Sequence, residues 1–192
     1  MNKFNTEAIV LKHIKYKDTD KIYTLLSKDK GKISAIAKGV RKITSRRSGS
    51  LDTLNNINVQ INKHKSGQNY IVEASVIKAY SNLKKDFELL KKSFYLVELV
   101  NKALWEDEST DDIYSLLVKA MSDLEETKEK PEILINKFEI KFMQLLGYEP
   151  KKSLLLSWRE KIRAGEHATA DMLVKNFVSE MLEENLKSLE LD

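Results

Sequence analysis

The residues of this 192-residue chain that could do chemistry are mostly cations, and the densest group lies early in the sequence. Five of them fall within ten residues: Lys38, Arg41, Lys42, Arg46 and Arg47. Cations this close together repel one another, and the phosphates of a nucleic-acid backbone would reverse that cost. Glycines and serines in the same segment let the backbone approach phosphates and add hydrogen-bond donors. The segment predicts a polyanion site, although such a run can also be only a solvated loop.

A second, smaller group of cations lies further along the chain. Lys63 and Lys65 stand beside a Ser-Gly pair that predicts a hairpin turn, and we expect them to extend the same binding groove. Tyr16 and Tyr70 are possible stacking platforms for bases, although a tyrosine in a strand more often only packs. We therefore expect phosphate contacts from the cations and only secondary contributions from these rings.

Groups typical of catalysis are sparse. The chain has no cysteine, which excludes disulfides, thiolate zinc sites and thiol redox chemistry. None of the three histidines stands at a metal-ligand spacing. Asp18 and Asp20 could hold a divalent ion, as in a nuclease, but Lys17 and Lys21 flank them, so capping or salt bridging explains them better. We predict that the protein is not an enzyme and has no metal or cofactor.

The distribution of charge supports a polyanion partner for the first part of the chain. Residues 1–80 carry 16 Lys or Arg and 6 Asp or Glu, a balance of +10, whereas the remaining residues carry 17 and 23, a balance of −6. Such asymmetry favours binding of a nucleic acid by the basic part. A basic surface kept only for solubility is the alternative.

The basic segment must be held by strands, because the first 80 residues have the patterns of short strands and tight turns. Apolar or alternating runs predict strands at Ala8–Ile14, Ile22–Leu26, Ile33–Ala37, 57–61 and 72–76. Turn signals lie at Asp29–Gly31 and His64–Gln68. Five strands joined by turns suit a small closed barrel better than an open sheet with exposed edges.

After Tyr80 the apolar spacing becomes helical. It predicts a helix from Leu83 to Leu104, a second one with a capping box at Ser109 and Asp112, and a third from Pro131 to Gly147. A last helix is expected to begin at a Thr169 cap, and the segment Lys151–His167 stays unassigned. The fold class is therefore α+β: a barrel domain over 1–80, then a helical domain over 81–192, with no flexible linker between them.

Several ordered motifs resemble the RecO family of DNA repair and recombination mediators. In the barrel region these are Glu7–Lys12, Asp18–Ile22, Lys30–Gly39 and Ser45-Arg46. Lys78–Leu83 is similar to the family's strand-to-helix junction, and Leu145–Pro150 to a motif that closes a central helix. The resemblance implies a five-stranded OB-fold barrel, which agrees with the strand pattern.

Three features depart from the family pattern. Many members follow the Leu-Gly-Tyr-x-Pro motif with a four-cysteine zinc site, whereas here Lys151–Ser157 follows with no cysteine. The chain is also shorter after that point, so the zinc module is expected to be trimmed away. In addition, Leu51-Asp-Thr-Leu54 stands where many relatives have Leu-Gln-Pro-Phe.

The resemblance implies non-catalytic work on DNA: binding of single and double strands, annealing of complementary strands, and help in loading recombinase. Its implied partners are the tail of single-stranded-DNA-binding protein and RecR. A protein-interaction adaptor whose barrel does not bind nucleic acid remains the alternative. The chain has neither a signal peptide nor an apolar run of about 18 residues that could span a bilayer, so we expect a cytoplasmic, nucleoid-associated protein without a membrane partner.

Overall fold

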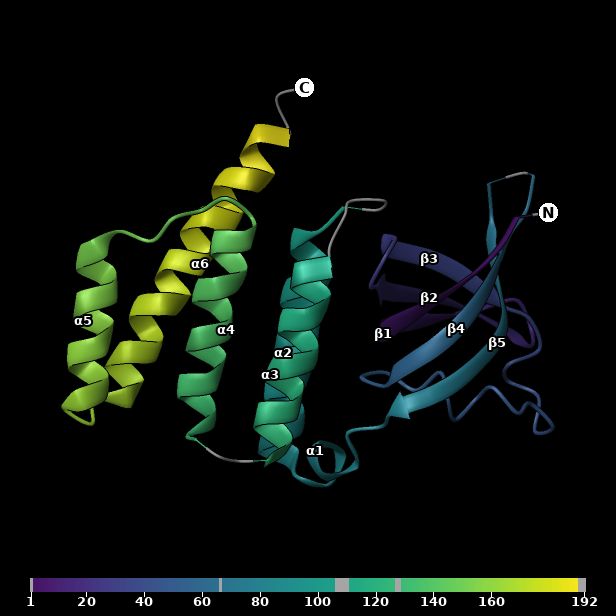
Figure 1. Ribbon diagram of the computed structural model, residues 1–192, viewed down its shortest axis with the longest axis horizontal. Helices are drawn as coiled ribbons and strands as arrows, with labels where there is room; N and C mark the ends of the chain where they lie inside the picture. The colour runs from purple at the N-terminus through teal and green to yellow at the C-terminus, as the bar shows by residue number, and fades with distance from the viewer. Residues whose placement is uncertain (1, 66, 106–110, 127–128, 190–192) are drawn as a thin grey trace. The chain divides into compact units, whose positions relative to one another are not determined.

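The computed structural model describes residues 2–65, 67–105, 111–126 and 129–189. Five strands come first: β1 (Asn2–Tyr16), β2 (Asp20–Ser27), β3 (Gly31–Ala37), β4 (Asn56–Lys63) and β5 (Asn69–Lys78). Six helices follow: α1 (Ser81–Lys85), α2 (Phe87–Ala103), α3 (Asp111–Glu126), α4 (Pro131–Leu145), α5 (Lys152–Arg163) and α6 (His167–Leu189). The chain thus passes once from strands to helices, as Figure 1 shows.

The strands form a closed barrel in the order β1-β2-β3-β5-β4, and β4 pairs with β1 to complete it. All pairings are antiparallel except the short one between β3 and β5, where Ile36 lies opposite Tyr70. A closed five-stranded barrel with this order is an OB-fold. The predicted fold class, an OB-fold barrel followed by helices, is confirmed.

Alternation along each strand decides which side chains enter the barrel. In β4, Ile57, Val59 and Ile61 are buried, while Asn58 is exposed and Gln60 is partly exposed. The inward residues of all five strands make one core. Its members include Ala8, Val10, Tyr23, Leu25, Ile33, Ala35 and Ile71. Because the core uses every second residue, the other half of β4 is left to form an outer polar face.

Both predicted turns are present. Gly31 has a φ of +69°, a left-handed conformation that glycine adopts without steric cost, and it pairs with Ser27 across the β2–β3 hairpin. In the β4–β5 hairpin, the backbone amide of His64 donates to the carbonyl of Gln68 at 2.9 Å. The second hairpin carries Lys63 and Lys65 to one end of the barrel.

The helix predicted from Leu83 to Leu104 is two helices. The carboxylate of Asp86 accepts hydrogen bonds from the backbone amides of Glu88 at 2.9 Å and Leu89 at 3.0 Å, so it caps α2 and separates it from α1. An aspartate with extended backbone is a strong N-cap, and it outweighs the continuous apolar spacing. Phe87, the first residue of α2, is 71% exposed as a result.

The later helices follow the predictions in part. The capping box proposed for α3 includes Ser109, which lies outside the described residues. Pro131 begins α4, and Gly147, at a φ of +90°, follows its end, as predicted. The cap at Thr169 was wrong, because α6 begins at His167.

The unassigned segment 151–167 holds α5, an amphipathic helix with no fully buried residue. The basic last turn of α5 contains Lys161 and Arg163, which suits the negative end of a helix. Regular helical structure therefore continues beyond the Leu145–Pro150 motif, where many family members are expected to have zinc ligands.

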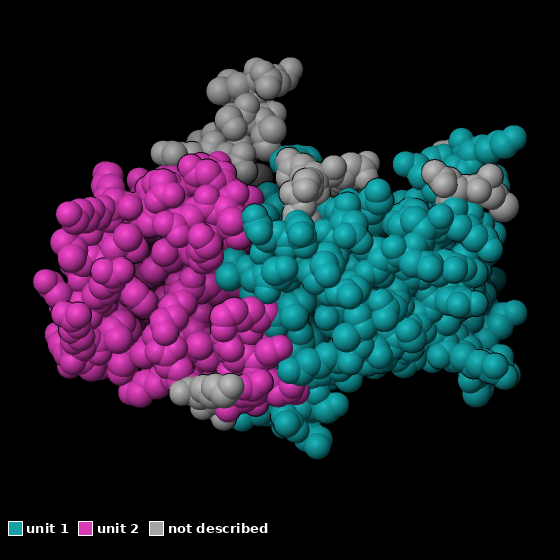
Figure 2. Space-filling view, viewed as in Figure 1, with its two compact units in different colours: residues 1–118 teal, residues 119–192 magenta. Residues whose placement is uncertain are grey.

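The described chain divides into two compact units, residues 1–118 and residues 119–192, drawn in different colours in Figure 2. The first unit contains the barrel, α1, α2 and the first half of α3. The domain boundary near residue 81 stays a prediction. No described helix has a stretch long and apolar enough to cross a membrane.

Candidate nucleic-acid interface

The basic loop between β3 and β4 is fixed at both ends by apolar side chains. Val40 and Leu51 are buried in the barrel core, and Leu54 is fully buried at a φ of +76°. The amide of Leu54 donates to the carbonyl of Val10 at 2.9 Å, and the amide of Val10 donates to the carbonyl of Asn55 at 3.0 Å. The cations between these anchors are therefore held on a defined path over the barrel.

One arm of the loop lies against the β1–β2 turn. The carboxylate of Asp20 accepts a hydrogen bond from the amide of Gly39 at 2.8 Å. That bond lowers the pKa of Asp20, and the hydroxyl of Thr19 acts in the same direction. Arg41 donates through its backbone amide to the carbonyl of Thr19 and through its guanidinium to that of Asp18, at 2.9 and 2.8 Å.

These contacts give the two aspartates a structural use. Asp20 positions the start of the basic loop, and the backbone of Asp18 holds Arg41. Among the described residues, no group of three or more histidines and carboxylates is placed to hold a metal ion. Asp18 and Asp20 thus lie at the β1–β2 turn, and both anchor the basic loop: Asp20 through its carboxylate and Asp18 through its backbone carbonyl.

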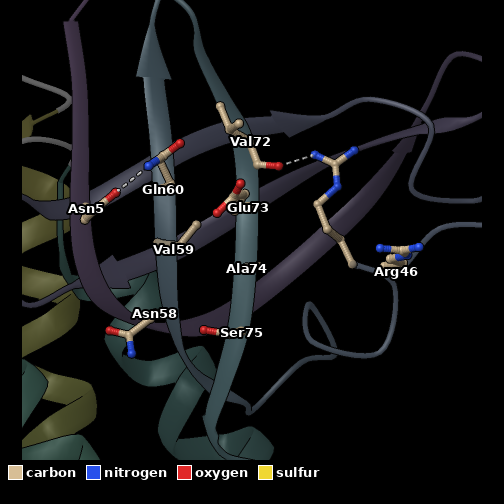
Figure 3. A pocket seen from close by; sticks show the side chains of 10 residues that line it. Asn5, Arg46, Asn58, Val59, Gln60, Val72, Glu73, Ala74 and Ser75 are labelled. Atoms are coloured by element: carbon tan, nitrogen blue, oxygen red, sulfur yellow. Dashed lines mark hydrogen bonds between the residues drawn. The ribbon is translucent and has the colours of Figure 1, made fainter.

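The other arm of the loop lies along β5, and Arg47 holds it there. Its guanidinium donates to the carbonyls of Ile71 at 2.5 Å, Val72 at 3.3 Å and Lys38 at 2.7 Å. Figure 3 shows the bond to Val72 as a dashed line. Arg47 is only partly exposed, so its main contacts are to the protein backbone.

Lys38 lies next to the hairpin that carries the second group of cations, Lys63 and Lys65. Its ammonium lies 4.6 Å from the centre of the Tyr70 ring, a cation–π contact. Tyr70 in turn meets the His64 ring edge-on, with the centroids 6.3 Å apart. Lys38 and the hairpin that carries Lys63 and Lys65 therefore share one side of the barrel.

Four predicted cations have exposed side chains with no hydrogen bond or ion pair to another described residue: Lys42, Arg46, Lys63 and Lys65. Ile43, next to Lys42, is fully exposed at the surface of the same loop. Ile43 was not among the predicted site residues, although an isoleucine inside a basic run is a visible signal. Apolar side chains of this kind can wedge between bases.

Two lysines of the first unit donate hydrogen bonds to other parts of the protein. Lys84 donates to the Asn55 side-chain oxygen at 2.6 Å, and burial lowers its pKa. Lys32 of β3 donates to the carbonyls of Asn101, at 2.8 Å, and Leu104 at the end of α2. A cation suits these last carbonyls because the C-terminal end of a helix is negative. Neither lysine belongs to the exposed cationic surface.

A hollow of about 460 Å³ lies beside Arg46 and Arg47 on the outer face of β1, β4 and β5. Its polar lining comes from neighbouring strands, as Figure 3 shows: Asn5, Asn58, Gln60, Glu73 and Ser75. The volume is within the range of small-ligand pockets, ~300–1,000 Å³. The polar alternation of β4 is visible in the sequence, but its place beside the basic loop is not, because the strand and the loop meet only in the tertiary structure.

Two family models match this chain. The model "Recombination protein O N terminal" matches residues 1–80, and "Recombination protein O C terminal" matches residues 85–153. The first ends where the barrel ends, and the second ends just inside α5. Together they span most of the chain.

Curated relatives agree with the family models. DNA repair protein RecO of Thermoanaerobacter sp. (strain X514) is 35% identical over 153 residues, which cover 79% of this chain and 60% of that protein. The protein of the same name from Chlorobium limicola is 33% identical over 147 residues, which cover 76% of this chain and 56% of that protein. The matched part thus spans about 60% of the length of such relatives. With its closed barrel and both domains matched, the chain belongs to the RecO family.

Proposed function

We propose that this protein takes part in DNA repair as a non-catalytic DNA-binding mediator. Its barrel binds single- and double-stranded DNA through the basic loop and the β4–β5 hairpin, and it anneals complementary single strands. The observation that carries the proposal is the anchored loop, which presents Lys42 and Arg46 without competing partners among the described residues. Family membership supports the same role, because the relatives are named DNA repair proteins.

The mechanism is electrostatic. Each phosphate contact with a lysine or arginine releases condensed counterions, which supplies affinity without regard to base sequence. Two complementary strands repel each other through their phosphates, and a cationic surface lowers that repulsion when both strands are bound. Annealing then needs no chemical step, only a surface on which the two strands meet and pair.

We infer further roles from membership of the RecO family and not from contacts of particular residues. The protein helps to load recombinase, together with RecR, on strands coated by single-stranded-DNA-binding protein, and it binds the tail of that protein. It works in the cytoplasm, in association with the nucleoid. The cationic residues assigned to DNA are Lys38, Arg41, Lys42, Arg46, Lys63 and Lys65, while Arg47 acts mainly by holding the loop in place.

A second candidate function is a protein-interaction adaptor, favoured by apolar side chains on the surface of α2. Phe87 is 71% exposed and Phe94 is 46% exposed. Phe94 also borders a hollow of about 260 Å³ that includes His13 and Thr53 of the barrel. Exposed aromatic side chains are typical of protein contacts. In this alternative the barrel does not bind nucleic acid.

A strand-annealing assay, with and without single-stranded-DNA-binding protein, tests the proposal. We expect the wild-type protein to accelerate pairing of complementary oligonucleotides, and the double variant K42Q/R46Q to lose most of that acceleration. The control is K91Q/K102Q, which removes two exposed positive charges that pair with Glu88 and Glu98 on α2. Equal annealing by all three proteins would refute the assignment of DNA binding to the loop. If the wild-type protein does not bind the oligonucleotides at all, the adaptor function is favoured.

A further inference from the structure

The hollow beside Arg46 combines groups that a phosphate alone does not need. Its lining has three side-chain amides, one hydroxyl and one carboxylate, next to two arginines. Asn5 and Gln60 lie opposite each other on β1 and β4, and Gln60 lies opposite Glu73 on β5. These three polar side chains thus form a row across three strands on the outside of the barrel.

Glu73 is the residue that distinguishes this hollow from a simple cationic surface. Its side chain is exposed, and within the described residues no hydrogen bond or ion pair occupies its carboxylate. The neighbouring amide of Gln60 donates instead to the side-chain oxygen of Asn5, at 3.1 Å (Figure 3). A free carboxylate beside Arg46 repels the phosphates of a bound strand, unless the ligand also brings a hydrogen-bond donor to that carboxylate.

Nucleobases bring such donors. The N4 amino group of cytosine donates to a carboxylate, whereas thymine places the acceptor O4 at the same position. Amide side chains such as Asn58 can donate and accept, so they can bind the adjacent N3 atom, which accepts a hydrogen bond in cytosine and donates one in thymine. A base that is unstacked from a single strand exposes this edge, while its phosphate stays within reach of a cation such as Arg46.

We propose that the hollow is a base-binding subsite that takes one unstacked base of single-stranded DNA and prefers cytosine to thymine through Glu73. This inference rests on the proposed function, because it assumes that the loop cations hold the strand. A base held there by its pairing edge is released when the complementary strand competes for that edge.

The test compares binding of two homopolymers of about 15 nucleotides, near the upper site size of one OB-fold barrel. Oligo-deoxycytidine and oligo-deoxythymidine carry the same phosphates, and their bases differ in the group at position 4, in the proton on N3 and in the C5-methyl group of thymine. We expect the wild type to bind the cytosine polymer about 3- to 10-fold more tightly, the range of one net hydrogen bond. In E73Q that ratio falls to about one, because glutamine can donate to O4 or accept from N4.

A matched variant separates base preference from net charge. E88Q removes an exposed carboxylate at the start of α2, so it raises general DNA affinity as E73Q does but keeps the cytosine preference. Equal binding of the two polymers by the wild type, with strong salt dependence retained, would overturn the subsite and leave the proposed function standing. A preference that survives in E73Q would also overturn it. Absence of binding to either polymer would overturn both.

Discussion

At the scale of single residues, the cations of the basic loop divide by their partners. Arg47 donates to three backbone carbonyls, and Arg41 donates to the carbonyl of Asp18. Lys38 lies over the Tyr70 ring. Lys42 and Arg46 have no such contacts with described residues and point their charge at solvent. Equal residue types in one loop therefore differ in structure: some hold the loop, and Lys42 and Arg46 are left for the phosphate contacts that we propose.

This division predicts how salt will affect DNA binding. If Lys42 and Arg46 each contact one phosphate, as we propose, replacing both by glutamine should flatten the slope of log K against log salt by about 1.5, near 0.7–0.9 for each contact. The measurement is an oligonucleotide titration at several salt concentrations. The control K91Q/K102Q should keep the wild-type slope. A double variant with the wild-type slope and affinity would show that these two side chains do not meet phosphates.

At the scale of elements, side chains of the barrel support the helices that follow it. Lys32 of β3 reaches the last carbonyls of α2. The hydroxyl of Tyr114 on α3 lies within hydrogen-bond distance of Glu7 of β1 and Asn56 of β4, at 3.1 and 3.0 Å. These bonds satisfy polar groups that would otherwise be left unpaired where strands and helices meet. They explain why the first compact unit continues beyond the barrel.

We expect K32M to lower the free energy of unfolding by about 1–2 kcal/mol, because methionine keeps an apolar stem but leaves helix-end carbonyls without their cation. Urea denaturation of the full chain measures the effect. The control is K30M in the exposed β2–β3 turn, which should change stability by less than about 0.5 kcal/mol. If both variants match the wild type, the contact between Lys32 and α2 does not stabilise the protein.

Side-chain hydrogen bonds between helices hold α5 in place, although none of its residues is fully buried. The indole of Trp158 donates to the side-chain oxygen of Asn136 on α4, at 3.1 Å. The Asn136 amide is within 3.1 Å of Glu139 and 2.9 Å of Asp171, on α4 and α6. A single buried amide therefore connects α4, α5 and α6 and positions α5 within the second unit.

At the scale of the whole molecule, two buried tyrosines make the stability of the fold sensitive to high pH. Burial raises the pKa of the Tyr23 hydroxyl to about 12, the Asp52 carboxylate adding to this shift and the Arg47 cation opposing it. Burial also raises the pKa of Tyr114. Both hydroxyls are neutral in the folded protein at a pH where an unfolded chain would already lose the proton.

The protein should therefore become less stable as pH rises above the ordinary pKa of tyrosine. The stabilisation from Tyr23 is fully present below pH 10.0, the ordinary pKa of tyrosine, and is lost as pH rises towards about 12. Across that window the free energy of unfolding should fall by up to roughly 1.4 kcal/mol per pH unit for this one group. Urea denaturation of wild type and Y23F at a series of pH values measures it. Parallel pH profiles for the two proteins would contradict the assignment.

Much of the fold could be predicted from local pattern. The alternation of Ile57, Val59 and Ile61 fixed a strand, and Pro131 marked the start of a helix. The failures also have local causes: the Asp86 side chain outweighed a continuous apolar spacing and split one predicted helix. The segment that became α5 was left unassigned: its helix is amphipathic, but it buries none of its residues completely.

The sequence by itself determined the barrel, the position of its basic loop and the excess of positive charge in the first 80 residues, because strand alternation, turn residues and charge are properties of neighbouring residues. Only the tertiary structure decided which cations are free to meet a ligand. Arg47 and Arg46 are adjacent in the chain, yet one is used up by carbonyls of β5 and the other borders a hollow lined by β1, β4 and β5. The reason is physical: backbone carbonyls and polar side chains from distant strands compete with a ligand for each cation, and folding brings them together.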